Sequence, residues 1–297
     1  MKRINIFLFT LSFLLLSCNT NSAQSVEEVD GMIIKCKFPD MRVMDESPEK
    51  IIKTLGYRAK YLTEQANIVY NDTSGIFQIE LPGITELNAD LFLSHGNMSI
   101  NQIWNKTDKE MIIPPKIDRL LNENGYLESM SNALIYIIDK EKINLLDSAF
   151  HEAYQNERIS TKLKFLWSWK EDVPDKGTLY AVKESPYKID LNKMHKSSKK
   201  EDSDGYKYIA ITLNKEGADR FALLTKNSIG TYLPIILDER VLSAPTVNLE
   251  ITGGKLQIST GFEDKDMQLL LALLNSPVIR SNPKLISVEI KSTEKDQ

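Results

Sequence analysis

The stretch from Tyr208 to Phe262 constrains the fold more than any other part of the chain, because its hydrophobic period changes at turn residues. Ile209, Ile211 and Leu213 alternate as one face of a strand, and Asn214 is a typical N-cap for a helix beginning at the next residue. Small and apolar residues then recur at helical spacing: Ala218, Phe221, Ala222 and Thr225. The pattern predicts a strand that leads directly into a helix.

A hairpin and a glycine corner come after that helix. Leu233–Leu237 is a short strand of the buried type, and Asp238-Glu239 is short enough to turn the chain into Val241 and the next strand. Gly253-Gly254 allows a corner with positive φ, which a residue with a Cβ would resist, before Leu256 and Ile258. No phosphate-binding pattern surrounds these glycines, so backbone geometry is the favoured reason for them.

Together these segments resemble the periplasmic head of SecD, including the fused SecD–SecF proteins, a family that assists protein export from the far side of the bacterial inner membrane. The motifs that carry the resemblance occur in the family's order and at similar spacing: Asn214-Lys-Glu-Gly-Ala218, Thr225-Lys-Asn-Ser-Ile-Gly230, Ile235-Ile-Leu-Asp238 with Ser243-Ala-Pro245, and Ile251-Thr-Gly-Gly254 before Gln257-Ile-Ser259. The resemblance implies a binding module for polypeptide as it emerges.

The first half of the chain has its own pattern. Ser47 and Pro48 begin a predicted helix. The expected elements around it are strands at 33–38, 67–70, 76–81 and 98–104, with a short helix at 87–93. The order βαββαβ is that of the split ferredoxin-like unit. Ile79-Glu-Leu-Pro-Gly83 also resembles the base subdomain of the SecD periplasmic region.

We therefore expect an α+β protein with a ferredoxin-like base, an inserted helical segment and a SecD-like head. The expected divisions are a signal peptide at 1–17, a tether at 18–30, a base at 31–104 with 276–291 as a candidate to complete it, a helical insertion at 105–160, a head at 161–275 and a disordered tail at 292–297. Within the head, the charged run Lys196–Asp204 is interpreted as a solvated loop.

The N-terminus predicts where the protein resides. Lys2 and Arg3 precede an apolar run, Ile4–Leu16, that is too short to span a membrane and suits a secretory signal. Leu15-Leu16-Ser17-Cys18 resembles the lipobox of bacterial lipoproteins, which implies cleavage before Cys18 and lipid attachment to it. Several acyl chains on one residue anchor firmly. The alternative is a plain secretory signal with a chance cysteine.

The resemblance to lipoproteins also bears on the membrane and on energy coupling. Asn19 stands where the enterobacterial inner-membrane retention signal has Asp, so the outer membrane is favoured. SecD proteins carry transmembrane helices with ionisable residues thought to couple proton flow to movement. A chain held only by lipid has no such charge path, so we expect no proton-motive coupling of its own.

The charge and the titratable residues exclude several function classes. Without residues 1–17 the chain has 35 basic and 41 acidic residues, a formal charge of −6, so nucleic acid is not an expected partner. His151-Glu152 resembles the start of a zinc-protease helix, but Gln155 replaces the second histidine. We predict no catalytic, metal or cofactor residues and no enzyme activity. Cys36 is predicted to lie in the core.

Two functions remain open. The first is a lipid-anchored, non-enzymatic envelope protein that binds exported polypeptide or a translocation or assembly partner, in a groove or by strand addition to a sheet edge. The second is a lipoprotein that reuses the fold for a small ligand, a glycan or an unrelated surface protein. The polypeptide-binding residues are not assigned. The tryptophans are the best candidates for an exposed apolar contact, although core burial is favoured for each: Trp104, Trp167 and Trp169.

Overall fold

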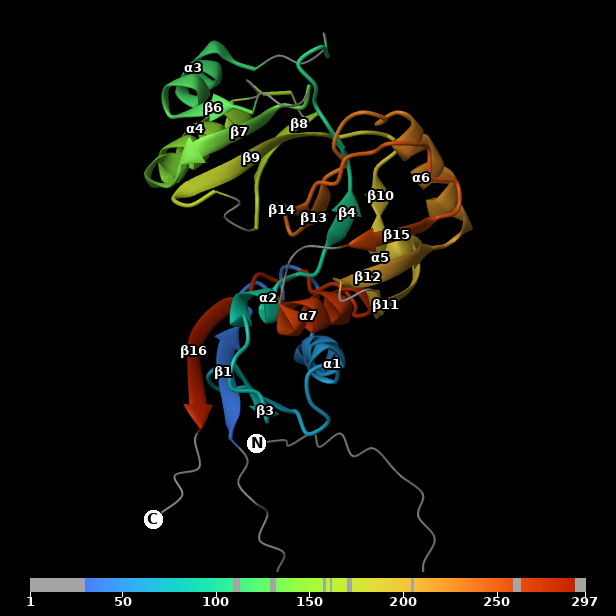
Figure 1. Cartoon of the computed structure of the whole chain (residues 1–297). Helices are drawn as coiled ribbons and strands as arrows, with labels where there is room; N and C mark the ends of the chain where they lie inside the picture. Colours follow the sequence, from blue (N-terminus) through green and yellow to red (C-terminus); the bar gives the residue numbers. More distant parts are fainter. Residues whose placement is uncertain are drawn as a thin grey trace, which may run out of the picture. The chain divides into compact units, whose positions relative to one another are not determined.

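The computed structural model of the chain describes residues 30–108, 113–128, 132–156, 159–160, 162–169, 173–203, 206–258 and 263–291. These residues form two compact units, each drawn in Figure 1. We call the unit that ends at His95 and resumes at Ile279 the terminal unit, and Gly96–Val278 the central unit. Both contain helices and strands, and the pairings between their named strands are antiparallel, as expected for the predicted α+β class. The predicted signal peptide, Cys18 and the tail at 292–297 lie outside the described residues.

The terminal unit has one antiparallel sheet with the strand order β16-β1-β3-β2. Its elements in chain order are β1 (Gly31–Lys37), α1 (Pro48–Ala59), β2 (Asn67–Asn71), β3 (Ile76–Pro82), α2 (Ala89–Leu93) and β16 (Lys284–Lys291). Figure 1 shows β16, in red, beside β1, in blue. The two ends of the described chain therefore meet in one sheet.

Helix α1 begins where the sequence predicts it. Ser47 Oγ accepts a hydrogen bond from the Lys50 N–H at 3.4 Å, and Pro48 is the first helical residue. The helix and the sheet share a core of apolar side chains: Ile34, Cys36, Ile51, Leu55, Ile79 and Leu81. The predicted burial of Cys36 is confirmed.

A buried arginine joins the two helices of the terminal unit. Arg58, near the end of α1, has no exposed surface. Its guanidinium donates to the main-chain carbonyls of Phe92, Ser94 and His95 at 2.7, 2.6 and 3.0 Å. These carbonyls lie at the C-terminal end of α2, where helical carbonyls have no partner within the helix. Arg58 therefore supplies the donors that α2 lacks.

The strand expected to complete the base, Met98–Trp104, lies elsewhere. It forms β4 (Met98–Ile100), which pairs with strands of the central unit, and β5 (Gln102–Ile103). All three residues of β4 are buried, as in an interior strand, whereas β16 has the exposed residues typical of an edge. The expectation of Met98–Trp104 in the base sheet was wrong, whereas the candidate segment 276–291 supplies β16 beside β1. Both segments are strand-like, and the sequence does not specify which one pairs with β1.

The described residues of the central unit form three sheets. Their strand orders are β10-β4-β13-β14, β11-β12-β15 and β5-β9-β7-β6, and β8 also pairs with β9. The elements after β5 are α3 (Pro115–Glu123), β6 (Gly125–Leu127), β7 (Ile135–Asp139), α4 (Ile143–Gln155), β8 (Leu163–Trp167), β9 (Lys176–Lys183), β10 (Ile189–Asp190), α5 (Leu191–Met194), β11 (His195–Ser203), β12 (Tyr206–Leu213), α6 (Lys215–Lys226), β13 (Ile235–Leu237), β14 (Arg240–Ser243), β15 (Lys255–Ile258) and α7 (Asp264–Leu274).

Two expectations for this unit need correction. The segment 105–160 is not purely helical, because it also supplies β6 and β7, and β7 pairs with β9. Residues 134–138 form an apolar run that is buried throughout, as expected for a strand covered on both faces. The run predicted as a solvated loop at 196–204 instead forms most of β11. Lysine-rich edge strands are common because their charge opposes aggregation.

Within the described part of the chain, none of the helices combines the length and the hydropathy needed to cross a bilayer.

Candidate functional site

A cavity of about 650 Å³ opens in the central unit beside the edge strand β15. We call this cavity the β15 groove. It is lined by residues from β11, β12, β15, α6 and β13 and from the segment 245–251. The lining residues are Ile100, Lys199, Ala210, Ile211, Thr212, Phe221, Thr225, Leu233, Ile235, Pro245, Thr246, Val247, Asn248, Leu249, Ile251, Lys255, Leu256 and Gln257.

Helix α6 forms one wall of the β15 groove, and the helix begins after its N-cap, where the sequence predicts. The Asn214 side chain accepts a hydrogen bond from the Gly217 N–H at 2.8 Å. Thr225 on the inner face of α6 is fully buried, and its hydroxyl donates to the Phe221 carbonyl at 2.8 Å. The same hydroxyl accepts from the Ile251 N–H at 3.0 Å. Thr225 therefore ties the segment 245–251 to the helix.

The predicted glycine corner brings β15 close to α6. Gly254 has a φ of +59°, and a Cβ at this position would lie 2.5 Å from the Ala218 Cβ. Gly253 has no positive φ and no atom near the position of a Cβ, so only the second glycine of the pair is required by geometry. The corner ends in a hydrogen bond from the Leu213 N–H to the Gly254 carbonyl at 2.8 Å.

Strand β15 leaves one edge open beside the groove. It pairs with β12, and no other strand of the described residues pairs with it. In an antiparallel pair, successive residues direct their main-chain groups to opposite sides. Because Gly254 bonds to β12, Leu256 and Ile258 also face β12, and Lys255 and Gln257 direct their N–H and C=O groups away from it. These groups are available to another extended chain.

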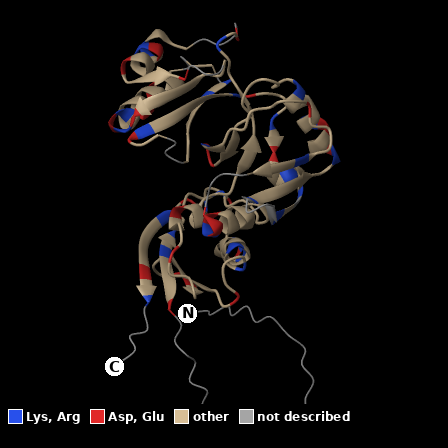
Figure 2. Cartoon of the chain, viewed as in Figure 1, with Lys and Arg blue, Asp and Glu red and all other residues tan. Residues whose placement is uncertain are grey.

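The lining of the groove is mainly apolar, with hydroxyl, amide and two lysine side chains. No carboxylate occurs among the described residues that line it. Leu249, in the segment 245–251, and Ile229, which forms a bridge with Val247, are both exposed. Figure 2 shows acidic and basic residues interspersed over the helices and strands of both units. Apolar contact and main-chain hydrogen bonding are therefore the chief means of binding that the groove offers.

The histidines and tryptophans lie apart from the groove. His95 Nδ1 is 2.8 Å from the Ile279 carbonyl, His151 bonds to Gln155, and His195 begins β11. The searched, described residues contain no group of His, Cys, Asp and Glu that could hold a metal ion. The tryptophans are buried or half-buried, and their indole N–H groups donate to neighbours: Trp104 to Lys162, Trp167 to Asp147 and Trp169 to Leu237.

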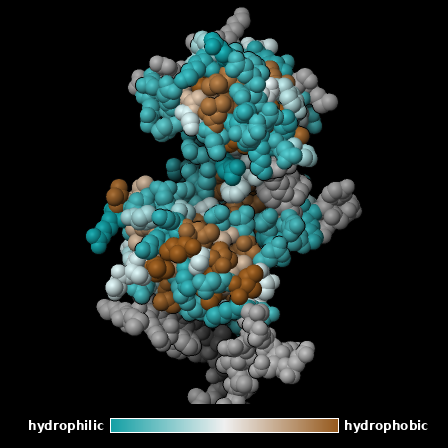
Figure 3. Space-filling view, turned by 90° about the vertical axis from the view of Figure 1, so that its left-hand side faces the viewer, coloured by the Kyte–Doolittle hydropathy of each residue, from teal (hydrophilic) through white to brown (hydrophobic). Residues whose placement is uncertain are grey.

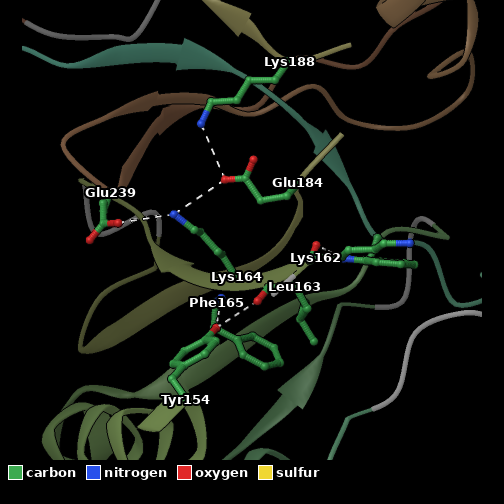
Figure 4. Close-up of polar contacts among 9 residues, drawn as sticks. Tyr154, Lys162, Leu163, Lys164, Phe165, Glu184, Lys188 and Glu239 are labelled. Carbon is green, nitrogen blue, oxygen red and sulfur yellow. Dashed lines mark hydrogen bonds and ion pairs between the residues drawn. The ribbon is translucent and has the colours of Figure 1, made fainter. Parts of the chain in front are cut away.

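A separate polar cluster, drawn in Figure 4, holds α4 and the β13–β14 hairpin against β8. The Tyr154 hydroxyl accepts from the Phe165 N–H at 3.0 Å and donates to the Leu163 carbonyl at 3.2 Å. Burial raises the pKa of Tyr154, so the hydroxyl keeps its proton. Lys164 lies between Glu184 and Glu239, at 3.6 and 3.5 Å. These ion pairs are partly or largely exposed, so they contribute little to stability.

The residues that line the β15 groove were not predicted from the sequence. Its strand, helix and glycine corner were predicted, but the lining comes from segments between residues 100 and 257 that only the fold brings together. No local signal marked these residues, because a single apolar residue in a turn-rich segment, such as Leu249, is ordinary on a protein surface.

Comparison with known proteins places this region in a family. Residues 168–279, which include every lining residue of the β15 groove except Ile100, match the family described as SecDF, P1 head subdomain. The chain is 31% identical over 221 residues to the protein translocase subunit SecD of Rickettsia conorii, covering 68% of this chain and 43% of that protein. It is 39% identical over 75 residues to SecD of Acidaminococcus fermentans, covering 25% of this chain and 18% of that protein.

Solved structures of SecDF also match. One, in a super-membrane-facing form, is 16% identical with a TM-score of 0.47 over 89% of this chain and 30% of that one. Another, of a membrane component SecDF that enhances protein export, is 19% identical with a TM-score of 0.44 over 88% of this chain and all of that one. The chain spans less than half the length of the curated relatives it matches. The expected resemblance to the periplasmic region of SecD is confirmed by the head match and the SecD relatives.

Proposed function

We propose that this chain is a lipid-anchored, non-enzymatic protein of the bacterial cell envelope that binds extended polypeptide in the β15 groove. The observation that supports this most directly is the free edge of β15 beside a mainly apolar groove, within the segment that matches the SecDF P1 head. The relatives are named protein translocase subunits, so the partner class we propose is exported polypeptide or a component of export or assembly machinery.

Binding by strand addition explains how one groove can accept many sequences. The outward main-chain groups of Lys255 and Gln257 bond to the backbone of an extended chain, whatever its side chains are. Alternate side chains of that chain then enter the apolar lining. Affinity comes from the backbone and the apolar surface, and the preference is for unfolded over folded chains.

The anchor and the domain roles are part of the proposal. Cys18 carries the lipid, the outer membrane is the favoured membrane, and the chain has no proton-motive coupling of its own. We infer that the terminal unit corresponds to a ferredoxin-like base, because β1, α1, β2, β3, α2 and β16 succeed one another in the order βαββαβ when the central unit is treated as an insertion.

A matched pair of variants tests the binding mode. Gln257→Pro removes an outward N–H without removing a bond to β12, and proline is tolerated at a sheet edge. Gln257→Ala removes the side chain and keeps the N–H. The probe is a fluorescent test protein that is reduced and carboxymethylated, compared with the same protein in its folded form. We expect Gln257→Pro to weaken binding of the unfolded probe about tenfold and Gln257→Ala to leave it nearly unchanged.

Other outcomes overturn the proposal. Equal binding of the folded and unfolded probes, or binding of neither, contradicts polypeptide recognition, and tight binding of a small ligand or glycan would support the rival function.

The lipid anchor has a separate test. If Cys18→Ala still yields a cleaved, membrane-bound protein of unchanged mass, lipidation at this residue is refuted. In-cell photocrosslinking from the rim of the groove, combined with mass spectrometry, identifies the partner in either case.

A further inference from the structure

Apolar surface alone does not distinguish the β15 groove from other parts of the protein. Figure 3, which faces the side on which β16 lies in Figure 1, shows hydrophobic residues gathered on the terminal unit, to which the groove does not belong. Val288 and Ile290 of β16 are 41% and 60% exposed. Any selectivity that the groove has must therefore come from another of its properties.

Charge is the property that separates the groove from the chain as a whole. The chain has a formal charge of −4, whereas the described lining contains two lysines, Lys199 and Lys255, and no carboxylate. Glu250 belongs to the segment 245–251 but does not line the groove. Lys255 is exposed on β15 and forms no ion pair with another described residue. The groove is therefore locally cationic in an acidic protein.

Both lysines project from one face of the β11-β12-β15 sheet. Lys199 lies opposite Ala210, and Lys255 lies opposite Thr212, two residues further along β12. Residues that lie directly opposite each other share a face, and so do residues two apart in one strand. All four of these residues line the groove. This face of the sheet is therefore the floor of the groove.

Helix α7 packs on the opposite face of the same sheet. Ser198 and Lys200 alternate with Lys199 along β11, so they project from that other face. Lys200 pairs with Asp264, the first residue of α7, at 3.1 Å. The Asn275 side chain, just after the last residue of α7, donates to Ser198 Oγ at 2.9 Å. The two lysines of the groove therefore lie on the face that α7 does not cover.

We propose that the β15 groove selects extended segments that carry an acidic side chain opposite Lys255. This inference rests on the function proposed above and gives it a specificity. In a strand added to β15, the residue opposite Lys255 projects from the same face as the lysine, so a carboxylate there forms a cross-strand pair of opposite charge. A Lys or Arg side chain at that position faces a like charge, which disfavours the pairing.

The acid that fits this geometry is a side chain and not the carboxylate at the end of a polypeptide. The main chain of an added strand lies in the plane of the sheet, whereas the Lys255 side chain projects out of that plane. An internal Asp or Glu reaches the ammonium group from the same face, while the segment continues past it in both directions.

Blocked peptides test this preference with the full-length chain. Each peptide is acetylated and amidated, alternates Thr with Val, and has Glu, Gln or Lys at its central Thr position; the anisotropy of an attached fluorophore reports binding. We expect the Glu peptide to bind about tenfold more tightly than the Lys peptide, with the Gln peptide between them. Because Lys255 is exposed, this ratio should fall as salt is added.

Two charge reversals show whether Lys255 is responsible. Lys255→Glu should abolish or reverse the preference for the Glu peptide, because β15 then carries an acid at this position. Lys215→Glu changes the net charge equally at an exposed residue that does not line the groove, and it should keep the preference. A peptide that has Gln at the centre and a free C-terminal carboxylate should bind no more tightly than the blocked Gln peptide.

The results that overturn this inference differ from those that overturn the proposed function. Equal binding of the Glu and Lys peptides leaves strand addition standing and removes the specificity. Equal effects of Lys255→Glu and Lys215→Glu trace the preference to net charge and not to this position. A free C-terminal carboxylate that binds as tightly as the Glu peptide assigns the groove to chain ends instead. If none of the peptides binds, both the proposed function and the specificity are wrong.

Discussion

Replacing Arg58 with methionine should open the terminal unit and leave the central unit intact. The guanidinium has no exposed surface and donates to three carbonyls at the end of α2, two of the three contacts being fully buried. Methionine fills a similar volume and donates nothing. The variant therefore leaves buried acceptors without these donors while it also removes a buried charge.

The expected loss of stability can be worked out from these contacts. A buried acceptor that loses its partner costs about 1–3 kcal/mol, and removal of the buried charge offsets part of that cost. We expect a net loss of about 3 kcal/mol in the free energy of opening of the terminal unit. Since about 1.4 kcal/mol corresponds to a factor of ten, opening should become about 100-fold more frequent.

Cys36 provides the assay. It lies in the core of the terminal unit with no exposed surface, so a thiol reagent reaches it only when this unit opens. The reaction is monitored in a Cys18→Ser background, in which Cys36 is the sole cysteine. Arg58→Met should accelerate modification of Cys36 about 100-fold. Fluorescence from Trp104, Trp167 and Trp169, all in the central unit, should not change.

Two further variants distinguish the loss of the Arg58 hydrogen bonds to α2 from a general effect of mutation. Arg58→Lys keeps the charge but lacks the planar fork that reaches three carbonyls, and we expect an acceleration of about tenfold. Arg42→Met alters an exposed arginine in the turn before α1 and should have no effect. If Arg58→Met changes the rate no more than Arg42→Met does, the carbonyl contacts do not stabilise this unit and the reasoning is refuted.

Three other predictions concern the glycine corner, the hairpin and the buried thiol. Gly254→Ala should lower the free energy of unfolding of the central unit by about 2 kcal/mol or more, because φ is positive at this residue and the added Cβ meets Ala218. Gly253→Ala should change this free energy by no more than about 0.5 kcal/mol. Urea unfolding monitored by tryptophan fluorescence compares the two variants. Glu239→Gly should stabilise the same unit by up to about 1 kcal/mol, because Asp238 and Glu239 both have positive φ and glycine adopts this conformation without strain. Glu239→Gln keeps the backbone strain and serves as the control. A loss of stability in Glu239→Gly would contradict the argument. Burial raises the pKa of the Cys36 thiol from 9.0 to about 12, so the contribution of the protonated thiol to stability is complete below pH 9 and is lost as the pH rises toward 12. The free energy of unfolding of Cys36→Ala should therefore depend less on pH between 9 and 12. An unchanged dependence would refute the raised pKa of this thiol.

Local signals predicted much of the fold. Ser47 with Pro48 and Asn214 mark helix starts that the structure confirms, because a cap depends on residues within one turn. Pairing over long distances was beyond such signals. Met98–Ile100 and Lys284–Lys291 are both strand-like, and which of them lies beside β1 depends on how well each is buried in its final sheet.

The lining of the β15 groove could not be predicted either, because local patterns do not specify contacts between distant segments. Its strand and helix were predicted separately, but the hydrogen bond from Ile251 to Thr225 that closes one side joins two segments whose local patterns do not refer to each other. The charged run that became β11 shows that pairing with a neighbouring strand can override a composition typical of loops.

The pairing of β1 with β16 makes the terminal unit depend on the order in which the chain is delivered. Lys35 and Glu289, which pair across these strands, are 254 residues apart, and the whole central unit lies between them. A chain made from its N-terminus presents β1 well before β16, so the central unit has time to fold inside a loop that is still open. Until β16 arrives, Gly31, Ile33 and Lys35 lack their hydrogen-bonding partners. Closure of the terminal unit therefore waits until β16 has been made, and chains cut short before Lys284 leave β1 without this partner strand.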